Sequence, residues 1–348
     1  MMKSICLWAL LLCLMAPAAT FAQTTSKEKK ISGRFPAAKG KLVINNSYGK
    51  LELHTWDRNE VTVDITISVK AASAADAQDI LDKISISEPQ EKSPEIRYKT
   101  TIGSRRSFNK CEFRIDYVIN MPRRHTADLT NRYGSIDIAD AEGKLDIDLE
   151  YGALKTGQLK GPDKEIKVNF GSIVIASLET GIVRSSYSSM AIDNAGDIAV
   201  SNQFGRTTIG NVRDLDIDQR YGSLKINTAT QLNGTVQFSD LSLGKLLKSA
   251  LLKLEYCNRV KFDYVSADAD QIRINANFSN ITYHFDDNAS LAADIALSFG
   301  KLNNNNTSLV QLISSAKADR TATAYKGKIG SGRGSMILNV SYGNITFQ

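Results

Sequence analysis

The sequence predicts an all-β fold: a parallel β-solenoid, a flattened β-helix of about 17 residues per coil, preceded by a strand-rich cap with one helix. Aromatic residues followed by turn-formers recur at intervals of 17–22 residues, and apolar and polar residues alternate between them. Helical periodicity is confined to one short segment. A short fixed period is typical of stacked repeats, whose units bury their apolar faces only against their neighbours. The recurring aromatics are Tyr133, Tyr151, Phe170, Tyr187, Phe204, Tyr221, Phe238, Tyr256, Phe278 and Phe299.

Residues 1–22 are predicted to be a signal peptide. Lys3 provides a short positive start, Leu7 to Met15 an apolar run, and Thr20 to Ala22 a small-residue cleavage site. The apolar run is shorter than the roughly 20 residues that a transmembrane helix needs, and no later stretch approaches that length. We therefore expect an exported protein, in the periplasm or at the cell surface.

Residues 23–124 are predicted to form the capping module. Tyr48-Gly49 is an early copy of the repeated aromatic-glycine pair, and Val61 to Val69 alternates like a strand. Residues 73–83 carry apolar side chains at helical spacing, with Ser73 as the N-cap. We expect this helix to lie across an open end of the solenoid. A Pro-flanked loop and a strand from Cys111 to Ile119 complete the module.

Residues 125–302 are predicted to be the repeats, and residues 215–226 are the clearest unit. Alternation directs the apolar residues of each strand inward and the charged residues outward. The predicted interior residues are Leu145, Ile147, Ile166, Val168, Ile173, Ile175, Leu215, Ile217, Leu224 and Ile226, with Asp146, Lys167, Asp216 and Lys225 outside.

A glycine follows several of the aromatics, where we expect a corner that needs positive φ or a close backbone approach. These glycines are Gly134, Gly152, Gly171, Gly205 and Gly222. In weaker copies Ser188, Asn258 or Ser279 takes this role, and Asn258 is the one best able to adopt a left-handed conformation. Gly161 lies outside this phase, so valine is expected to cost less there than at Gly222.

Residues 303–348 are predicted to be a polar loop and a final coil. The loop starts at Asn303, and Tyr342 to Phe347 repeats the coil pattern as the last coil. Other repeat folds fit worse, because propeller blades need about 40 residues and helical repeats need a 3.6-residue period. An antiparallel sandwich would show hairpin turn pairs that are absent at these positions.

The chain resembles a bacterial family of adhesin-like β-solenoid domains of unknown function, related to autotransporter-adhesin head domains. The resemblance is carried by the export signal, the Asn46-Ser47-Tyr48-Gly49 strand, the Trp56-Asp57 turn, the single helix, and residues 118–122 leading into Asn131-Arg132-Tyr133-Gly134. It covers most of the mature chain and rests on pattern more than on any invariant chemical motif. It implies an exported, non-enzymatic protein associated with the cell envelope.

No catalytic, cofactor-binding or metal-binding residue is predicted. His54, His125 and His284 lie in unrelated contexts, without the spacing of a zinc site or a hydrolase triad. Alternating acids such as those of residues 145–150 raise the possibility of calcium, but acids that solvate the outside of a sheet explain the pattern better. Cys111 and Cys257 are expected to be free thiols, with a single bridge between them as the alternative.

These observations predict an exported, non-enzymatic β-solenoid that acts as an adhesive, binding or scaffolding element of the bacterial cell envelope. The expected partner is an envelope glycan or another envelope protein. Nucleic acid is excluded as a partner because the formal charge of +6 is mild and no basic-aromatic motif occurs. The alternative function is a polysaccharide lyase or hydrolase on a β-helix, which would need converging carboxylates. The aromatics form either an exposed glycan platform or a structural ladder, and the free exchange of Tyr and Phe across the ten positions favours the ladder.

Overall fold

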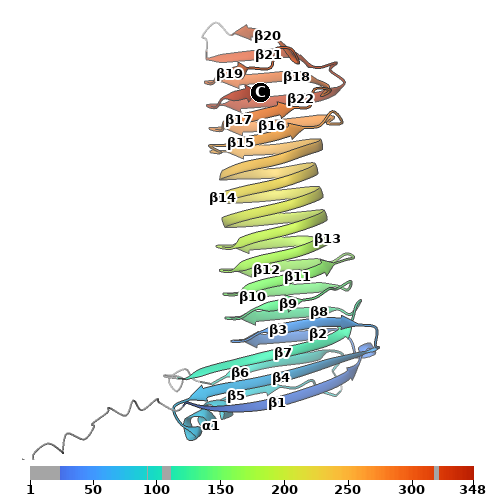
Figure 1. The fold of residues 1–348 in the computed structure, drawn as a ribbon, viewed down its shortest axis with the longest axis vertical. Coiled ribbons are helices and arrows are strands. Elements are labelled where there is room, and N and C mark those ends of the chain that lie inside the picture. The colour runs from blue at the N-terminus through green and yellow to red at the C-terminus, as the bar shows by residue number, and fades with distance from the viewer. Residues whose placement is uncertain (1–23, 92, 104–110, 317–320) are drawn as a thin grey trace, which may run out of the picture.

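The computed structural model describes residues 24–91, 93–103, 111–316 and 321–348, so the predicted signal peptide lies outside the described residues. Figure 1 shows strands stacked along one long axis, with the helix at the N-terminal end. All strands belong to one mixed sheet of 23 strands, which confirms the all-β class. Within the described part of the chain, no helix is long and apolar enough to cross a membrane.

The middle of the molecule consists of parallel strands stacked in two rows. In one row β8 pairs with β10 and β10 with β12, and in the other β9 pairs with β11 and β11 with β13. Paired residues are 17–22 positions apart, as in Ser172 with Ser189, Asp146 with Glu165 and Ser249 with Gln271. Figure 1 shows β14 winding through successive coils. The strands are β8 (Ala127–Arg132), β9 (Ile136–Ile138), β10 (Leu145–Glu150), β11 (Ala153–Leu159), β12 (Lys164–Asn169), β13 (Ser172–Ser186), β14 (Ser189–Glu255), β15 (Val260–Val265), β16 (Gln271–Asn277) and β17 (Ile281–Phe285).

The predicted strand register is confirmed. All ten residues predicted to be interior are at most 1% exposed, and the four charged residues predicted to be outside are exposed. In-register stacking places Ile147 beside Leu129 on one side and Ile166 on the other, so this interior position is enclosed by its equivalents in adjacent coils. The core is therefore one continuous apolar column.

Ile217→Asp should lower the free energy of unfolding by about 3 kcal/mol, because it buries an unpaired carboxylate in this column. Ile217 is 1% exposed, whereas the adjacent Asp216 is exposed, so Asp216→Ala should cost little. Urea unfolding of both variants checks the prediction. Equal midpoints for the two would contradict the assigned register.

The N-terminal end contains antiparallel strand pairs, unlike the parallel coils that follow it. Here β4 (Glu60–Ala71) pairs antiparallel with β1 (Thr25–Pro36) and with β7 (Glu112–Pro122), and β5 (Ile84–Ser87) pairs antiparallel with β6 (Ile96–Ile102). Strands β2 (Leu42–Ser47) and β3 (Leu51–Trp56) join this end to the coils by parallel pairing with β8 and β9. A parallel stack ends on an unpaired edge, and antiparallel strands extend that edge without a long crossover.

The predicted helix is confirmed as α1 (Ala74–Asp82), and a 3-10 turn, Ala37–Lys39, follows β1. The Ser73 hydroxyl accepts a hydrogen bond from the Asp76 backbone N–H at 3.1 Å, which satisfies a donor at the helix start. Ala77, Ile80 and Leu81 are buried, and the helix contacts β1, β4 and β5. It therefore covers the apolar interior at this end of the stack (Figure 1).

The C-terminal coil lies between two earlier coils, so the prediction that it is the last in the stack is wrong. β22 pairs in parallel with both β16 and β18, and β23 pairs in parallel with both β17 and β19. Beyond β18, β21 and then β20 add antiparallel strands. The bounds are β18 (Leu291–Ser298), β19 (Leu302–Asn304), β20 (Val310–Ala316), β21 (Ala322–Ile329), β22 (Gly334–Ser341) and β23 (Ile345–Phe347).

Candidate functional site: the aromatic ladder

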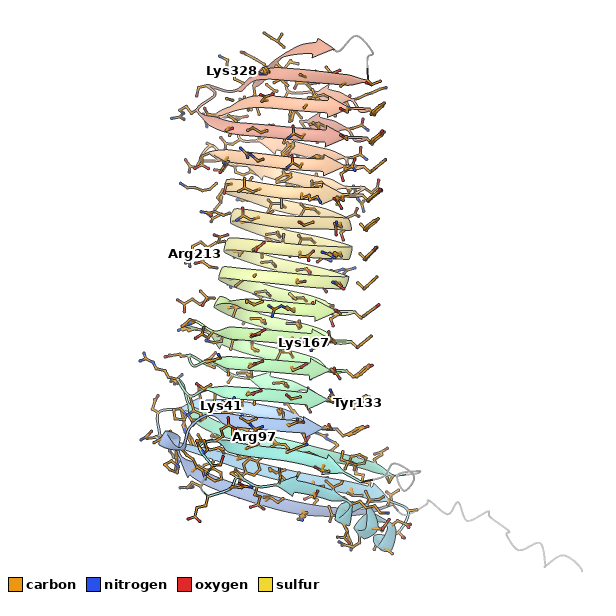
Figure 2. All side chains as sticks on the ribbon, turned by 180° about the vertical axis from the view of Figure 1, so that it is seen from behind. Lys41, Arg97, Tyr133, Lys167, Arg213 and Lys328 are labelled. Carbon is orange, nitrogen blue, oxygen red and sulfur yellow. The ribbon has the colours of Figure 1, made fainter. Side chains whose placement is uncertain are left out.

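The recurring aromatics form a single stack of rings along one edge of the molecule. Consecutive ring centroids are 4.7–5.1 Å apart and the ring planes agree within 16°. Figure 2 shows these side chains projecting in a row, with Tyr133 near the N-terminal end. We call this stack the aromatic ladder. Its spatial order is Tyr48, Tyr133, Tyr151, Phe170, Tyr187, Phe204, Tyr221, Phe238, Tyr256, Phe278, Tyr342 and Phe299.

Each corner is turned by the aromatic residue itself. Every ladder residue has φ between 48° and 61°, whereas none of the five predicted corner glycines has positive φ. The prediction of positive φ at the glycines is therefore wrong. A left-handed non-glycine residue costs roughly 1–2 kcal/mol. Stacking of each ring on its two neighbours stabilises the fold by about 0.5–1.5 kcal/mol per pair and so offsets this conformational cost.

The corner glycines are needed for close backbone approach, which was the other explanation considered. A Cβ on Gly222 would lie 1.9 Å from the carbonyl oxygen of Gly205 in the preceding coil, and one on Gly134 would lie 1.8 Å from that of Gly49. Gly161 has φ +74°, so valine would be strained there by the backbone conformation, and the lower cost of valine at Gly161 than at Gly222 stays a prediction.

Serine or cysteine replaces the glycine in some coils by turning its side chain inward. The hydroxyl of Ser239 accepts a hydrogen bond from the Gly222 backbone N–H at 3.1 Å, and that of Ser279 accepts one from the Cys257 N–H at 3.0 Å. The expectation for Asn258 is wrong, because Tyr256 holds the left-handed conformation and Cys257 occupies the corner position after it.

Tyr and Phe alternate strictly in space. From Tyr151 to Phe299 no two neighbouring rings are of the same type, because Tyr342 of the inserted coil separates Phe278 from Phe299. The sequence interpretation that the two residues interchange freely is therefore wrong. With successive centroid distances of 4.8 Å from Tyr187 to Phe204 and from Phe204 to Tyr221, the two hydroxyl-bearing rings lie about 9.6 Å apart. Between Tyr151 and Phe299 no two phenol rings stack directly on one another, whereas Tyr48, Tyr133 and Tyr151 form three consecutive tyrosines.

The ladder exposes ring edges, while its ring faces are covered. From Tyr133 to Phe299 the ladder residues are 43–56% exposed, yet both faces of each internal ring contact the neighbouring rings. A sugar ring could not stack face to face on these rings. What the ladder offers a partner is a long apolar ridge with phenol hydroxyls at regular spacing.

Tyr221→Ala should lower the free energy of unfolding by about 1–3 kcal/mol, because it removes the stacking contacts with Phe204 and Phe238. Tyr221→Phe keeps the ring and loses only an exposed hydroxyl, so it should be close to neutral. Thermal unfolding of the two variants tests the structural value of the ring. A neutral Tyr221→Ala would show that the ladder does not stabilise the fold.

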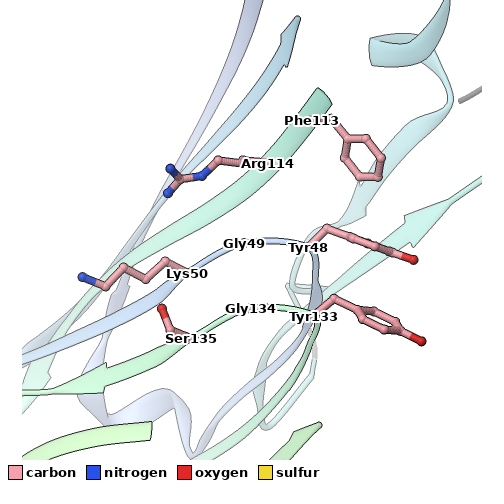
Figure 3. Close-up of a pocket in the computed structure, with 8 residues that line it drawn as sticks. All are labelled: Tyr48, Gly49, Lys50, Phe113, Arg114, Tyr133, Gly134 and Ser135. Carbon is pink, nitrogen blue, oxygen red and sulfur yellow. The ribbon is translucent and has the colours of Figure 1, made fainter. Parts of the chain in front are cut away.

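The ladder changes geometry at its N-terminal end. Phe113 meets Tyr48 at a centroid distance of 5.2 Å and an interplanar angle of 53°, so the regular stack stops there. A shallow hollow of about 320 Å³ lies at this point. Figure 3 shows that the Tyr48 and Tyr133 rings project to one side of the backbone and the Lys50 and Arg114 side chains to the other. The hollow is lined by Tyr48, Gly49, Lys50, Phe113, Arg114, Tyr133, Gly134 and Ser135.

Charged groups do not converge near the ladder. The cations at the hollow are paired: Lys50 Nζ lies 2.7 Å from Asp137 and Arg114 lies 2.9 Å from Asp116. Hydrogen bonds from the Lys50 ammonium to Asp137, and to a smaller extent to Glu52, raise the pKa of Lys50. The cations at this end are therefore engaged in ion pairs within the protein.

The remaining titratable candidates are dispersed. His54 is exposed on β3, His125 precedes β8, and His284 lies on β17. Desolvation lowers the pKa of His125. Cys111 is half-buried and Cys257 buried, no disulfide joins them, and burial raises the pKa of each. The structure does not bring these groups together into an acid-base or nucleophilic arrangement.

The alternating acids lie on the outside of the stack, as expected. Asp146 pairs in register with Asp128 and Glu165. Partial burial raises the pKa of Asp146, and the neighbouring carboxylates of Asp128 and Glu165 raise it further. Over the described ranges, no cluster of three or more potential metal ligands occurs. We expect EDTA to leave the melting temperature of the protein unchanged, as scanning calorimetry with and without the chelator would show. A drop of many degrees would indicate a structural cation.

Lys164 is a charged residue in an interior position that alternation alone would not reveal. It is 2% exposed, and its ammonium donates to the carbonyl oxygens of Lys160 at 2.7 Å, Pro162 at 2.9 Å and Gly161 at 3.2 Å. Desolvation lowers its pKa. Because these carbonyls saturate the donors, Lys164 holds the turn before β12 and has no free donor for a ligand.

Tyr48 and Tyr342 were recognised from the sequence as copies of the coil pattern but were not counted among the recurring aromatics, and Phe113 was not predicted. Tyr48-Gly49 and Tyr342-Gly343 carry the same aromatic-glycine pair as the repeats, and that signal could have placed them in the ladder. Phe113 has no such signal. It reaches Tyr48 only because β7 pairs with β3.

Comparison with known proteins gives structural likenesses only. No family model and no curated protein matches the chain. A "putative cell adhesion protein" from Clostridium sporogenes is 12% identical, with 92% of this chain and 99% of that chain covered and a TM-score of 0.21. A "putative adhesin" from Parabacteroides distasonis is 10% identical, with 92% and 97% covered and a TM-score of 0.31. A "putative lipid binding protein" from the same organism is 8% identical, with 92% and 96% covered and a TM-score of 0.28. TM-scores in this range do not establish a shared fold.

Proposed function

We propose that this chain is an exported, non-enzymatic parallel β-solenoid that acts as an adhesive, binding or scaffolding element of the bacterial cell envelope. The observation that carries this proposal is the aromatic ladder. It places apolar ring edges and phenol hydroxyls along the stack on a preformed surface, so a partner can bind over a long contact with little ordering cost. The partner is an envelope glycan or another envelope protein.

The arrangement of charge supports binding over catalysis. On the broad faces, acids and bases recur with the coil period and form ion pairs between coils, as Lys167 does with Asp148 at 3.2 Å and Arg184 with Glu165. A polysaccharide lyase or hydrolase instead needs an acid and a base that converge on one sugar. Periodic pairing suits a surface that repeats along its length.

Glycan-array binding and pull-down from envelope extracts with the mature chain test the proposal. The informative variant carries Tyr187→Phe, Tyr221→Phe and Tyr256→Phe together, which removes hydroxyls and keeps the rings. Weaker binding of a glycan by this variant, with an unchanged melting temperature, would support hydrogen bonding along the ladder. Lys225→Ala, on an exposed face position, is the matched control and should bind normally.

If the partner is an envelope protein, its binding should depend on the apolar edge of the ladder. Phe204→Ala should then weaken binding more than the tyrosine triple variant does. Absence of any glycan or protein partner, or binding indifferent to all ladder variants, would overturn the proposal. Release of unsaturated or shortened sugars from an envelope polysaccharide would establish the enzymatic alternative in its place.

A further inference from the structure

The four outer strands of the stack differ in how their free edges are protected. β1 is long, and its sequence carries Lys27, Lys29, Lys30 and Arg34, while β5 has four residues and contacts α1. β19 has three residues. Charge, shortness and covering elements are the usual ways in which proteins prevent edge strands from pairing with other chains. Each of these three edges has at least one of them.

The fourth edge, β20, has none of these protections. It is seven residues long, Val310–Ala316, and contains no charged residue. Within the described ranges, β20 pairs only with β21. Ile313 at its centre is 82% exposed, the highest value among the exposed large apolar side chains. An uncharged edge with an apolar side chain at its midpoint is suited to strand pairing.

The direction of the β20 backbone is fixed by its pairing. The Gly330 N–H donates to the Leu309 carbonyl. The N–H and C=O groups of the odd-numbered residues of β20 therefore point toward β21, and those of the even-numbered residues point away from it. The first outward residue, Val310, is bonded locally: its N–H donates to the Asn306 carbonyl and its carbonyl accepts from the Asn304 side chain at 3.0 Å. The outward backbone groups that follow belong to Leu312 and Ser314, on either side of Ile313.

We propose that β20 is the interface between two copies of this chain, which join end to end by antiparallel pairing of β20 with β20 about a two-fold axis at Ile313. In this register Leu312 of each copy forms a hydrogen-bonded pair with Ser314 of the other. Ile313 then faces its own equivalent in a non-hydrogen-bonded pair, where side chains approach most closely. The pairing extends the sheet from one copy into the next and buries the two exposed isoleucines.

Charge favours this symmetric contact over head-to-tail stacking of β20 on β1. The β1 edge presents several lysines, and β20 has no acid to pair with them. Two uncharged β20 strands meet without repulsion. An isologous contact also closes at two copies, whereas a head-to-tail contact would continue into a fibre.

Sedimentation velocity of the mature chain over a wide concentration range tests the proposal. The wild type should form a dimer, and Ile313→Lys should be monomeric with an unchanged melting temperature, because the side chain is exposed in the single copy and two charges would oppose each other in the pair. Val174→Lys, at an exposed apolar position on a broad face, is the matched control and should remain dimeric.

Ile313→Cys should form an intermolecular disulfide on mild oxidation, and Ser314→Cys should do so much more slowly, because only residue 313 faces its own equivalent. A monomeric wild type would overturn the proposal. So would a dimer or fibre that persists in Ile313→Lys and is lost when the β1 lysines are replaced. Failure of the envelope-binding assays would leave this interface unaffected, since it does not involve the ladder.

Discussion

Deletion of residues 334–348 should open the C-terminal part of the stack. This segment contributes Met336, Leu338, Val340, Ile345 and Phe347 to the core, each at most 2% exposed. Their burial is worth roughly 10 kcal/mol together. The deletion would also remove the strands that lie between β16 and β18 and between β17 and β19. Few single changes in the molecule remove as much burial and strand pairing at once.

Limited proteolysis with mass spectrometry should locate the loss. We expect cleavage throughout residues 290–333 in the deletion variant, with the coils from β8 to β14 still protected. Asn339→Ala is the control within the same strand: it removes an exposed hydrogen bond to Asn275 and should leave the protection unchanged. A synthetic peptide of residues 334–348 added in trans should restore protection. Unchanged protection after the deletion would contradict the inserted position of this coil.

The order of the coils could not be predicted from sequence because stacking carries little local signal. Gln271 pairs with Ser335, and Ala292 pairs with the same residue, so the inserted coil closes two long loops at once. Alternation fixed which side of each strand is buried, since that choice depends only on neighbouring residues. It contained no information on which coil lies above which. The alternation of Tyr and Phe reflects spatial order: it runs from Tyr151 to Phe278 in the sequence, and it continues to Phe299 only once Tyr342 is placed between these two rings.

The corner conformation was mispredicted for a related reason. Glycine is the residue best suited to positive φ, so the Tyr-Gly pair indicated a left-handed glycine. In the structure Tyr221 takes the left-handed conformation, with φ 53°, because this directs its ring onto the ladder. The glycine is required by its distance from the preceding coil, a tertiary property that the local sequence does not contain. The spacing of the ladder and most of its members were therefore predictable from the sequence, but its geometry was not.

Gly222→Val should lower the free energy of unfolding by about 4–5 kcal/mol, which is exceptional for an exposed residue. The added Cβ would lie 1.9 Å from the Gly205 carbonyl oxygen and 2.9 Å from its carbonyl carbon. Both are backbone atoms, so relief requires the two coils to separate and lose hydrogen bonds on either side of the corner. Because Gly222 does not have positive φ, alanine differs from glycine here only by the same Cβ. Gly222→Ala should therefore already cost about 3 kcal/mol.

Lys225→Val is the control for these two variants, since it places the same β-branched side chain at an exposed strand position three residues away and should be nearly neutral. Urea unfolding of the three variants distinguishes the possible causes. If no backbone atom lay close to Gly222, Gly222→Ala would be neutral or stabilising by up to about 1 kcal/mol, because glycine loses more conformational freedom on folding than alanine does. Close packing of successive corners instead predicts a large loss of stability in both Gly222→Ala and Gly222→Val, and no such loss in Lys225→Val.

The same close approach should recur at Gly134, where a Cβ would lie 1.8 Å from the Gly49 carbonyl oxygen. Gly134→Ala should therefore lower the free energy of unfolding by as much as Gly222→Ala does.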